Sequence, residues 1–154
     1  MRFSEAMTMT EGGDGRFAVT FDRSWWVVSG PNGGIIVALL VRAAQARLGT
    51  RKCVRTVTTH FLAAPTEGLA EIEVSVDRLG RVAGFATVRM LQDGRNIATA
   101  LIATAELPSP LHEWEQRCFP DLPALEDTWV MSSESADVPL RRRWDQRWGL
   151  GVPG

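Results

Sequence analysis

The sequence predicts an α+β domain in which one antiparallel sheet curves around a single long helix. Residues 35–48 are rich in Ala and Leu, hold no Gly or Pro, and are apolar on most helical faces. A helix of this kind must be buried. It is expected to start near residues 32–34 and to end at Gly49. Four strand candidates follow it, and a single sheet can bury such a helix only by curling around it.

The residues before the helix predict one strand and a long loop. Residues 16–21 alternate between apolar and polar side chains, which is typical of a strand. A turn is expected at residues 22–24, and the apolar residues 25–28 indicate a short strand or a packed loop. Residues 29–34 read Ser-Gly-Pro-Asn-Gly-Gly and give the strongest loop signal in the chain.

The residues after the helix predict four strands and two tight turns. The strands are expected over residues 54–62, 69–79, 82–92 and 95–107. Gly80-Arg81 suits a type II′ hairpin turn, and Asp93-Gly94 suits a type I′ turn. The last three strands should therefore form an antiparallel meander.

Length and composition indicate one globular domain followed by a tail. The chain has 154 residues, of which 45% are hydrophobic and 23% charged, which is ordinary for a globular protein. We expect a single domain over residues 1–107. Residues 108–154 are rich in Pro and Trp and are expected to form a tail or linker that packs on the domain.

Several classes of protein are disfavoured by charge, hydropathy and cysteine content. The net charge of −1 argues against nucleic acid as a partner. The longest uncharged apolar run, residues 33–41, is about half the length needed to cross a membrane. Two cysteines, Cys53 and Cys118, give neither a disulfide framework nor a metal-site spacing. With no apolar signal core near the N-terminus, a cytoplasmic protein without a metal is expected.

Six short segments occur in a recognisable order between residues 16 and 107. They are Trp25-Trp26, Pro31-Asn32-Gly33-Gly34, residues 38–44, Thr59-His60-Phe61-Leu62, Leu79-Gly80-Arg81 and Gln92-Asp93-Gly94. This ordered set resembles the thioesterase-like hotdog superfamily, and specifically its acyl-CoA thioesterase II branch. Members of that branch usually carry two fused hotdog repeats. This chain is similar to the first repeat, and residues 141–149 resemble the start of the connection into a second.

The resemblance implies hydrolysis of an acyl thioester carried by coenzyme A or by a carrier protein. Asn32, Gly33 and Gly34 open the predicted helix, where free N–H groups and the helix dipole favour a developing oxyanion. The two glycines would let a bulky thioester approach the backbone. In the alternative interpretation Asn32 only caps the helix and the glycines only permit close packing.

Two further side chains are candidates for the chemistry. Gln92 resembles the Gln of the family's Gln-x-Gly segment and could orient water or the thioester; otherwise it is a solvated strand end. His60 has an ordinary pKa near neutrality and could serve as a general base; otherwise it is a sheet residue without a catalytic role.

Substrate binding and assembly give further expectations. Arg81 could contact the phosphates of coenzyme A, and Ile36, Leu39 and Phe61 could line an acyl tunnel, although a plain core explains them equally well. No cofactor is expected beyond coenzyme A as part of the substrate. A curled sheet leaves an edge strand unpaired, so a homodimer or higher homo-oligomer joined through sheet edges is expected.

One departure from the resemblance supports a second hypothesis. Hotdog thioesterases generally carry Asp or Glu on the central helix, whereas residues 35–48 contain neither. The alternative is a non-catalytic acyl-binding or pairing subunit, or the first half of a two-repeat enzyme whose acid lies in the second half. The absence of a Gly-x-Ser-x-Gly segment argues against a serine hydrolase.

Overall fold

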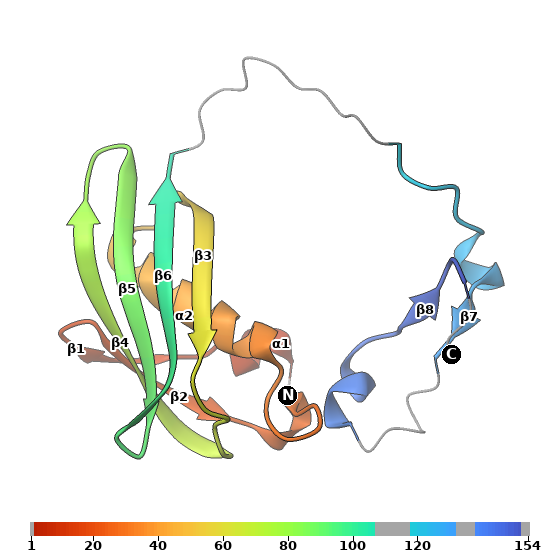
Figure 1. The fold of residues 1–154 in the computed structure, drawn as a ribbon, viewed down its shortest axis with the longest axis horizontal. Coiled ribbons are helices and arrows are strands. Elements are labelled where there is room, and N and C mark those ends of the chain that lie inside the picture. Colours follow the sequence, from red (N-terminus) through yellow and green to blue (C-terminus); the bar gives the residue numbers. More distant parts are fainter. Residues whose placement is uncertain (1, 107–117, 132–137, 152–154) are drawn as a thin grey trace.

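The structure is a computed structural model that describes residues 2–106, 118–131 and 138–151. A six-stranded antiparallel sheet curves around one long helix, α2 (Figure 1). The elements, in chain order, are α1 (Phe3–Ala6), β1 (Thr10–Gly13), β2 (Arg16–Phe21), η1 (Arg23–Trp25), α2 (Gly33–Leu48), β3 (Cys53–Phe61), β4 (Gly68–Leu79), β5 (Ala83–Gln92), β6 (Arg95–Ala105), η2 (Leu125–Asp127), β7 (Trp129–Val130), η3 (Pro139–Arg143) and β8 (Arg147–Trp148). The predicted α+β class is confirmed.

The strand order in the large sheet is β1-β2-β4-β5-β6-β3, and every neighbouring pair is antiparallel. The predicted meander of β4, β5 and β6 is therefore confirmed. Asp93 has φ 51° and Gly94 has φ 74°, as the predicted type I′ turn requires. Strand β3, which follows α2 in the chain, lies at one edge of the sheet beside β6, and β1 lies at the other edge.

The predicted type II′ turn at Gly80-Arg81 is wrong. That turn needs a positive φ at Gly80, and Gly80 does not have one. A register shift between Val76 and Arg78 makes Leu79 pair with Gly84. Gly80 consequently faces Ala83, to whose carbonyl its N–H donates at 2.8 Å, so the turn falls on Arg81-Val82 instead of Gly80-Arg81.

The N-terminal part of the domain contains structure that the sequence analysis did not predict. Strand β1 pairs with β2 through an Asp14-Gly15 turn in which both residues have positive φ, 48° and 77°. The apolar residues 25–28, expected as a strand or packed loop, begin within the short helix η1, after which Trp26 makes an isolated bridge with Pro31. The sheet thus gains an edge strand, and a compact loop precedes α2.

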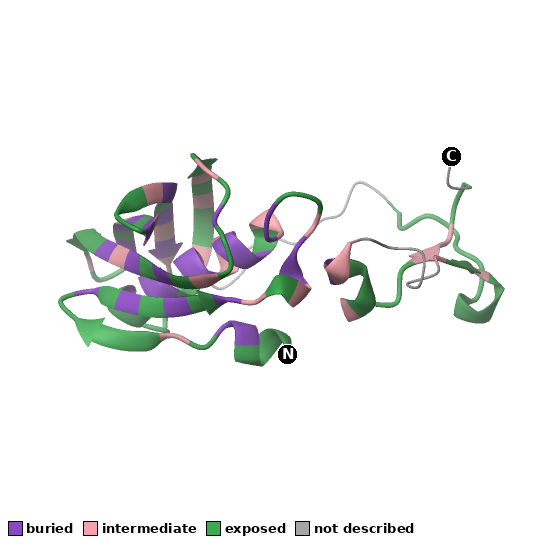
Figure 2. Cartoon of the chain, turned by 90° about the horizontal axis from the view of Figure 1, so that it is seen from below, coloured by how far each residue is buried: buried purple, intermediate pink, exposed green. Residues whose placement is uncertain are grey.

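The core lies between the sheet and one side of α2 (Figure 2). The buried residues of α2 are Ile35, Ile36, Leu39, Leu40, Ala43, Ala44 and Leu48. They pack against inward-facing side chains of the central strands, such as Ile72, Val88 and Met90. Val37, Ala38 and Val41 are only half-buried, so the expected burial of most helix faces is not reached. One sheet from one chain covers only one side of α2.

Part of the predicted tail is described. Strands β7 and β8 pair with each other, Trp129 opposite Trp148, and lie away from the large sheet (Figure 1). Between them, η3 returns to contact η1, and Leu140 is buried there. Among the described helices, none is both long and apolar enough to cross a membrane.

Candidate active site

The start of α2 leaves one backbone donor available. Asn32 is the N-cap, in an extended conformation with φ −55° and ψ 133°. Its side-chain Oδ1 accepts from the N–H of Gly34 at 2.8 Å, and its carbonyl accepts from the N–H of Ile35 at 3.0 Å. The N–H of Gly33 has no hydrogen-bond partner in the described part of the chain. The structure therefore shows the capping role of Asn32 directly and leaves Gly33 as the free donor.

A compact loop, residues 26–31, holds the helix start in place. The N–H of Asn32 donates to the carbonyl of Trp25 at 2.9 Å, and the N–H of Val27 donates to the carbonyl of Gly30 at 2.8 Å. The Trp26–Pro31 bridge closes the base of the loop. The loop and the first turn of α2 are thus linked by backbone hydrogen bonds, which fixes where Gly33 lies.

A cavity of about 380 Å³ lies between this loop, the start of α2 and the end of β3. It is lined by Val27, Ser29, Gly30, Pro31, Gly33, Ile36, Phe61, Leu62, Ala63, Ala64 and Pro65. The lining is mainly apolar, and none of these side chains is ionisable. The ring of Phe61 closes on Gly33 so tightly that a Cβ added at Gly33 would lie 3.1 Å from its Cζ. An apolar group therefore fits here with a backbone N–H beside it.

Residues 62–65 form one wall of the cavity, and Gln92 anchors the segment that follows them. Its Oε1 accepts from the N–H of Thr66 at 2.7 Å. Its Nε2 donates to the carbonyls of Thr66 at 3.0 Å and Leu69 at 3.1 Å. The side chain is 8% exposed and does not line the cavity. In this arrangement Gln92 positions the wall, and both of its amide protons are engaged.

The structure brings together only some of the predicted site residues. Gly33, Ile36 and Phe61 line the cavity, and Asn32 and Gly34 flank the free donor on the helix start. Leu39, predicted to bind substrate, is 1% exposed in the core and does not reach the cavity. Of the two α2 residues predicted to bind substrate, Ile36 therefore lies on the cavity wall and Leu39 lies in the core.

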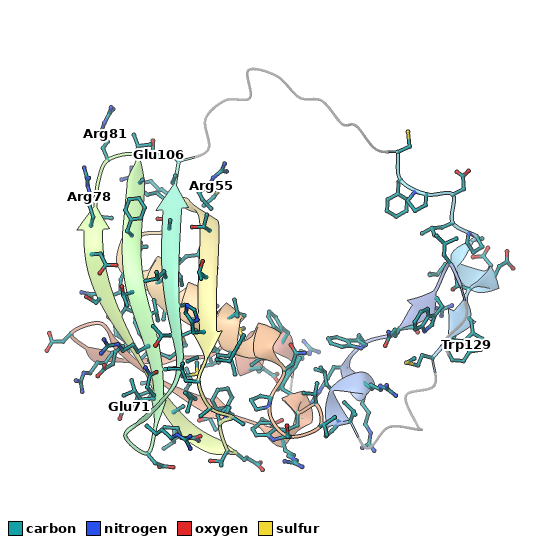
Figure 3. The ribbon with its side chains drawn as sticks, viewed as in Figure 1. Arg55, Glu71, Arg78, Arg81, Glu106 and Trp129 are labelled. Atoms are coloured by element: carbon teal, nitrogen blue, oxygen red, sulfur yellow. The ribbon has the colours of Figure 1, made fainter. Side chains whose placement is uncertain are left out.

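His60 and Arg81 lie away from the cavity. His60 pairs with Thr99, whereas Phe61 pairs with the buried Ala98. Since alternate residues of a strand point to opposite faces, His60 is on the outer face of the sheet, across from α2. Arg81 lies near Ala83, which pairs with Ala105 at the Cys53 end of β3. That end, with Arg55, Arg78 and Arg81 (Figure 3), is opposite the cavity.

The sequence analysis missed the two segments that build most of the cavity. Residues 27–31 and 62–65 are more than 30 positions apart, and no periodic pattern links them. A usable signal was present in each: the Ser-Gly-Pro-Asn-Gly-Gly loop and the Ala63-Ala64-Pro65 strand end. The first segment precedes α2 and the second follows β3. Loops at the ends of rigid elements often carry binding residues, which favours a shared site.

Electrostatics around η1 centre on Asp22. Its carboxylate accepts hydrogen bonds from the hydroxyl and the backbone N–H of Ser24, and these bonds hold the pKa of Asp22 below its ordinary value. The positive charge of Arg143, from η3, acts in the same direction. No group of three or more His, Cys, Asp or Glu side chains suited to a metal occurs among the described residues.

Comparison with known families matches residues 22–105 to the acyl-CoA thioesterase N-terminal domain. Among solved structures, a candidate thioesterase II from Thermobifida fusca YX is 28% identical, with a TM-score of 0.78 over 91% of this chain and 52% of that one. A hot dog fold protein of unknown function from Alicyclobacillus acidocaldarius is 24% identical, with a TM-score of 0.81 over the same shares. No curated protein matches.

A more distant solved structure carries a more specific name. The acyl-CoA thioesterase II TesB2 of Mycobacterium marinum is 14% identical, with a TM-score of 0.65 over 87% of this chain and 52% of that one. At this identity the likeness shows the fold alone. These structures confirm the predicted hotdog fold. The chain spans about half the length of each of the three.

Proposed function

Because the chain belongs to the family of acyl-CoA thioesterase N-terminal domains, we propose that it binds an acyl thioester of coenzyme A beside the start of α2 and takes part in its hydrolysis. The single observation that carries the proposal is the free N–H of Gly33 on the wall of an apolar cavity. No other described feature pairs an apolar site with a donor at a helix N-terminus.

We assign a role to each part of the cavity. The thioester carbonyl oxygen accepts a hydrogen bond from Gly33, and the dipole of α2 favours the negative charge that develops as water adds to the carbonyl carbon. The tetrahedral intermediate then expels the thiolate of coenzyme A, which takes up a proton. Val27, Ile36 and Phe61 surround the first part of the acyl chain.

The base that activates water is assigned to a second hotdog unit. Among the described residues, no ionisable side chain lines the cavity, and α2 carries no acid. The chain also spans about half the length of the solved structures that it matches. We therefore place the base in a second copy of this chain or in a second repeat, at the junction between the two units.

The surface for that second unit is the free edge of the sheet. Within the described ranges, strand β3 pairs with β6 alone, and none of its nine residues is buried. An unpaired edge of this length invites another strand. The apolar residues Val37, Ala38 and Val41 of α2 are only half-buried, and a partner at this edge would cover what the sheet leaves exposed of them.

One observation favours a different function. A cavity with a donor but no ionisable lining can hold an acyl thioester without cleaving it. In that case the chain is an acyl-binding or pairing subunit, and the chemistry belongs entirely to its partner.

The test measures free-thiol release from a panel of acyl-CoAs, short, long and aromatic, together with calorimetric titration of each acyl-CoA. Chain-length-dependent release above the spontaneous rate supports hydrolysis. Saturable binding without release supports the binding subunit. Neither binding nor release by the folded protein contradicts both functions.

A further inference from the structure

In the part of the C-terminal tail that the structure describes, η3 contacts the domain at η1 and at Trp26, beside the loop that lines the cavity. Leu140 of η3 is 3% exposed, although it lies in a segment most of whose other residues are exposed or half-buried. Its N–H donates to the carbonyl of Trp26 at 3.1 Å. The tail therefore inserts one leucine into the domain and adds a backbone hydrogen bond at the base of the loop.

A second contact from the same tail segment reaches Trp25. The guanidinium carbon of Arg143 lies 5.3 Å from the centre of the Trp25 ring, a cation–π arrangement. The ring of Phe3 also packs on Trp25 in a T-shaped arrangement, with ring centroids 5.9 Å apart. The indole N–H of Trp25 is buried and has no acceptor among the residues that the structure describes. Trp25 is thus held by packing, and Arg143 supplies part of it.

Trp25 and Trp26 connect these contacts to the proposed site. The carbonyl of Trp25 accepts from the N–H of Asn32, and Asn32 caps the helix through the N–H of Gly34. Trp26 bridges to Pro31, a cavity wall. The tail is therefore connected to the first turn of α2, and so to Gly33, by a continuous path of packing and hydrogen bonds.

We propose that residues 138–143 form a clamp that positions the cavity loop and the start of α2, with Leu140 and Arg143 as positioning residues. Without these contacts the loop would sample conformations in which Gly33 and the cavity wall are displaced. The likeness to the Thermobifida fusca structure covers 91% of this chain, more than residues 1–106 alone supply, so the tail belongs to the shared architecture. The effect on turnover rests on the proposed function; the positioning itself does not.

The test is hydrogen exchange measured by mass spectrometry on the full chain. Leu140→Ala should raise exchange in peptides covering residues 25–34 by about tenfold, because opening of a weakly held loop governs exchange there. Exchange in β5 and β6 should stay at the wild-type rate. Leu150→Ala is the matched control, since Leu150 lies in the same tail and is 59% exposed. Wild-type exchange at residues 25–34 in Leu140→Ala overturns the clamp.

A second pair of variants keeps the test decisive if Leu140→Ala unfolds. Arg143→Gln should accelerate exchange at residues 25–34, and Arg143→Lys should restore most of the protection because it keeps a cation over the ring. Arg142→Gln, at an exposed neighbouring arginine, should leave exchange unchanged. Equal effects of the Arg143→Gln and Arg142→Gln variants would overturn a specific role for Arg143.

Thiol release separates the clamp from the proposed function. If the wild type is active, Leu140→Ala should raise KM or lower kcat several-fold, with Leu140→Met restoring most of the loss. If the wild type is inactive, the proposed hydrolysis fails while the exchange result still decides the clamp. Faster exchange with unchanged kcat and KM would support the clamp on the loop and overturn its effect on turnover.

Discussion

Asn32 and Gly33 are adjacent in the chain but have different functions at the start of α2. The side chain of Asn32 is engaged in capping Gly34, whereas the backbone N–H of Gly33 is free and lies on the cavity wall. Stability should therefore depend on the Asn32 side chain, and thioester polarisation on the Gly33 backbone. A substitution that keeps the cap while changing the local charge separates the two roles.

The variant Asn32→Asp makes that separation. An aspartate oxygen caps a helix as well as an asparagine oxygen and suits the helix dipole, so the free energy of unfolding should stay within about 0.5 kcal/mol of the wild-type value. Its charge opposes an oxyanion at Gly33, so kcat for an acyl-CoA should fall by roughly tenfold. Urea unfolding and thiol release measure the two. A loss of stability with unchanged kcat would contradict the assignment.

Asp22 gives the protein an acid-sensitive contact. Its pKa is lowered in the folded state, first by the hydrogen bonds from Ser24. A carboxyl with a depressed folded-state pKa stabilises the fold above its unfolded pKa of about 3.9, and this stabilisation is lost as pH falls through the folded-state pKa. The stability difference between wild type and Asp22→Asn should therefore be largest near neutral pH and shrink below about pH 4. Urea unfolding between pH 7 and 3 checks it; a difference independent of pH would contradict it.

At the scale of elements, Gln92 connects β5 to the cavity wall. Its amide makes three hydrogen bonds to backbone groups of Thr66 and Leu69. Gln92→Met keeps the size of the side chain but leaves those groups without their partner, which should cost about 1–3 kcal/mol in the free energy of unfolding. Loss of these bonds should displace the cavity wall at residues 62–65 and leave the N–H of Gly33 in place. KM should therefore rise by a larger factor than kcat falls. A large fall in kcat with unchanged stability would instead indicate contact between Gln92 and the reacting atoms.

Elements with a strong local pattern were predictable from the sequence. Strand β2 occupies residues 16–21 as predicted, α2 begins at Gly33 and ends before Gly49, and Asp93-Gly94 forms its type I′ turn. Strand β1 was missed because Thr10–Gly13 is polar and glycine-containing, so its pairing depends on the Asp14-Gly15 turn rather than on periodicity. The turn at Gly80 was misassigned because a register shift in β4, set by tertiary pairing, places Leu79 opposite Gly84 and moves the turn to Arg81-Val82.

The candidate site likewise combines residues that a local sequence pattern predicts with residues that only the tertiary structure brings together. Gly33 and Phe61 were predictable because each lies at the end of a recognisable element. The face of His60 also follows from strand alternation, but which face carries α2 is known only once β3 is paired with β6. The cavity itself arises from two loops that meet in space, and the tail contact at Leu140 joins segments more than a hundred residues apart. Neither follows from local sequence.

At the scale of the whole molecule, the account requires a second hotdog unit at the edge strand. Thr58 lies on β3, and Ser75 lies on the interior strand β4 in the same cross-strand row and on the same outer face, through Leu101 and Thr87. Both are exposed. Thr58→Lys adds charge to the edge, a change that discourages strand pairing, and should raise the dimer dissociation constant at least about tenfold. Ser75→Lys adds the same charge away from the edge and should not.

Sedimentation velocity of the three proteins measures this. Weakened assembly of Ser75→Lys but not of Thr58→Lys would place the interface on the outer face of the sheet. A wild-type protein that stays monomeric would contradict pairing between two copies and leave the base in a second repeat.

The proposed hydrolysis depends on a single N–H group, and a substitution that removes only that group tests this dependence. Position 33 is the first residue of α2, where proline is well tolerated, and the extended Asn32 before it, with ψ 133°, suits a following proline. Gly33→Pro deletes the donor, and Gly33→Ala, which adds bulk against Phe61 but keeps the N–H, is its control. If the N–H of Gly33 polarises the thioester, kcat for acyl-CoA hydrolysis falls about 100-fold to 1,000-fold in Gly33→Pro relative to Gly33→Ala, with both variants folded. Equal kcat values in the two variants would contradict it.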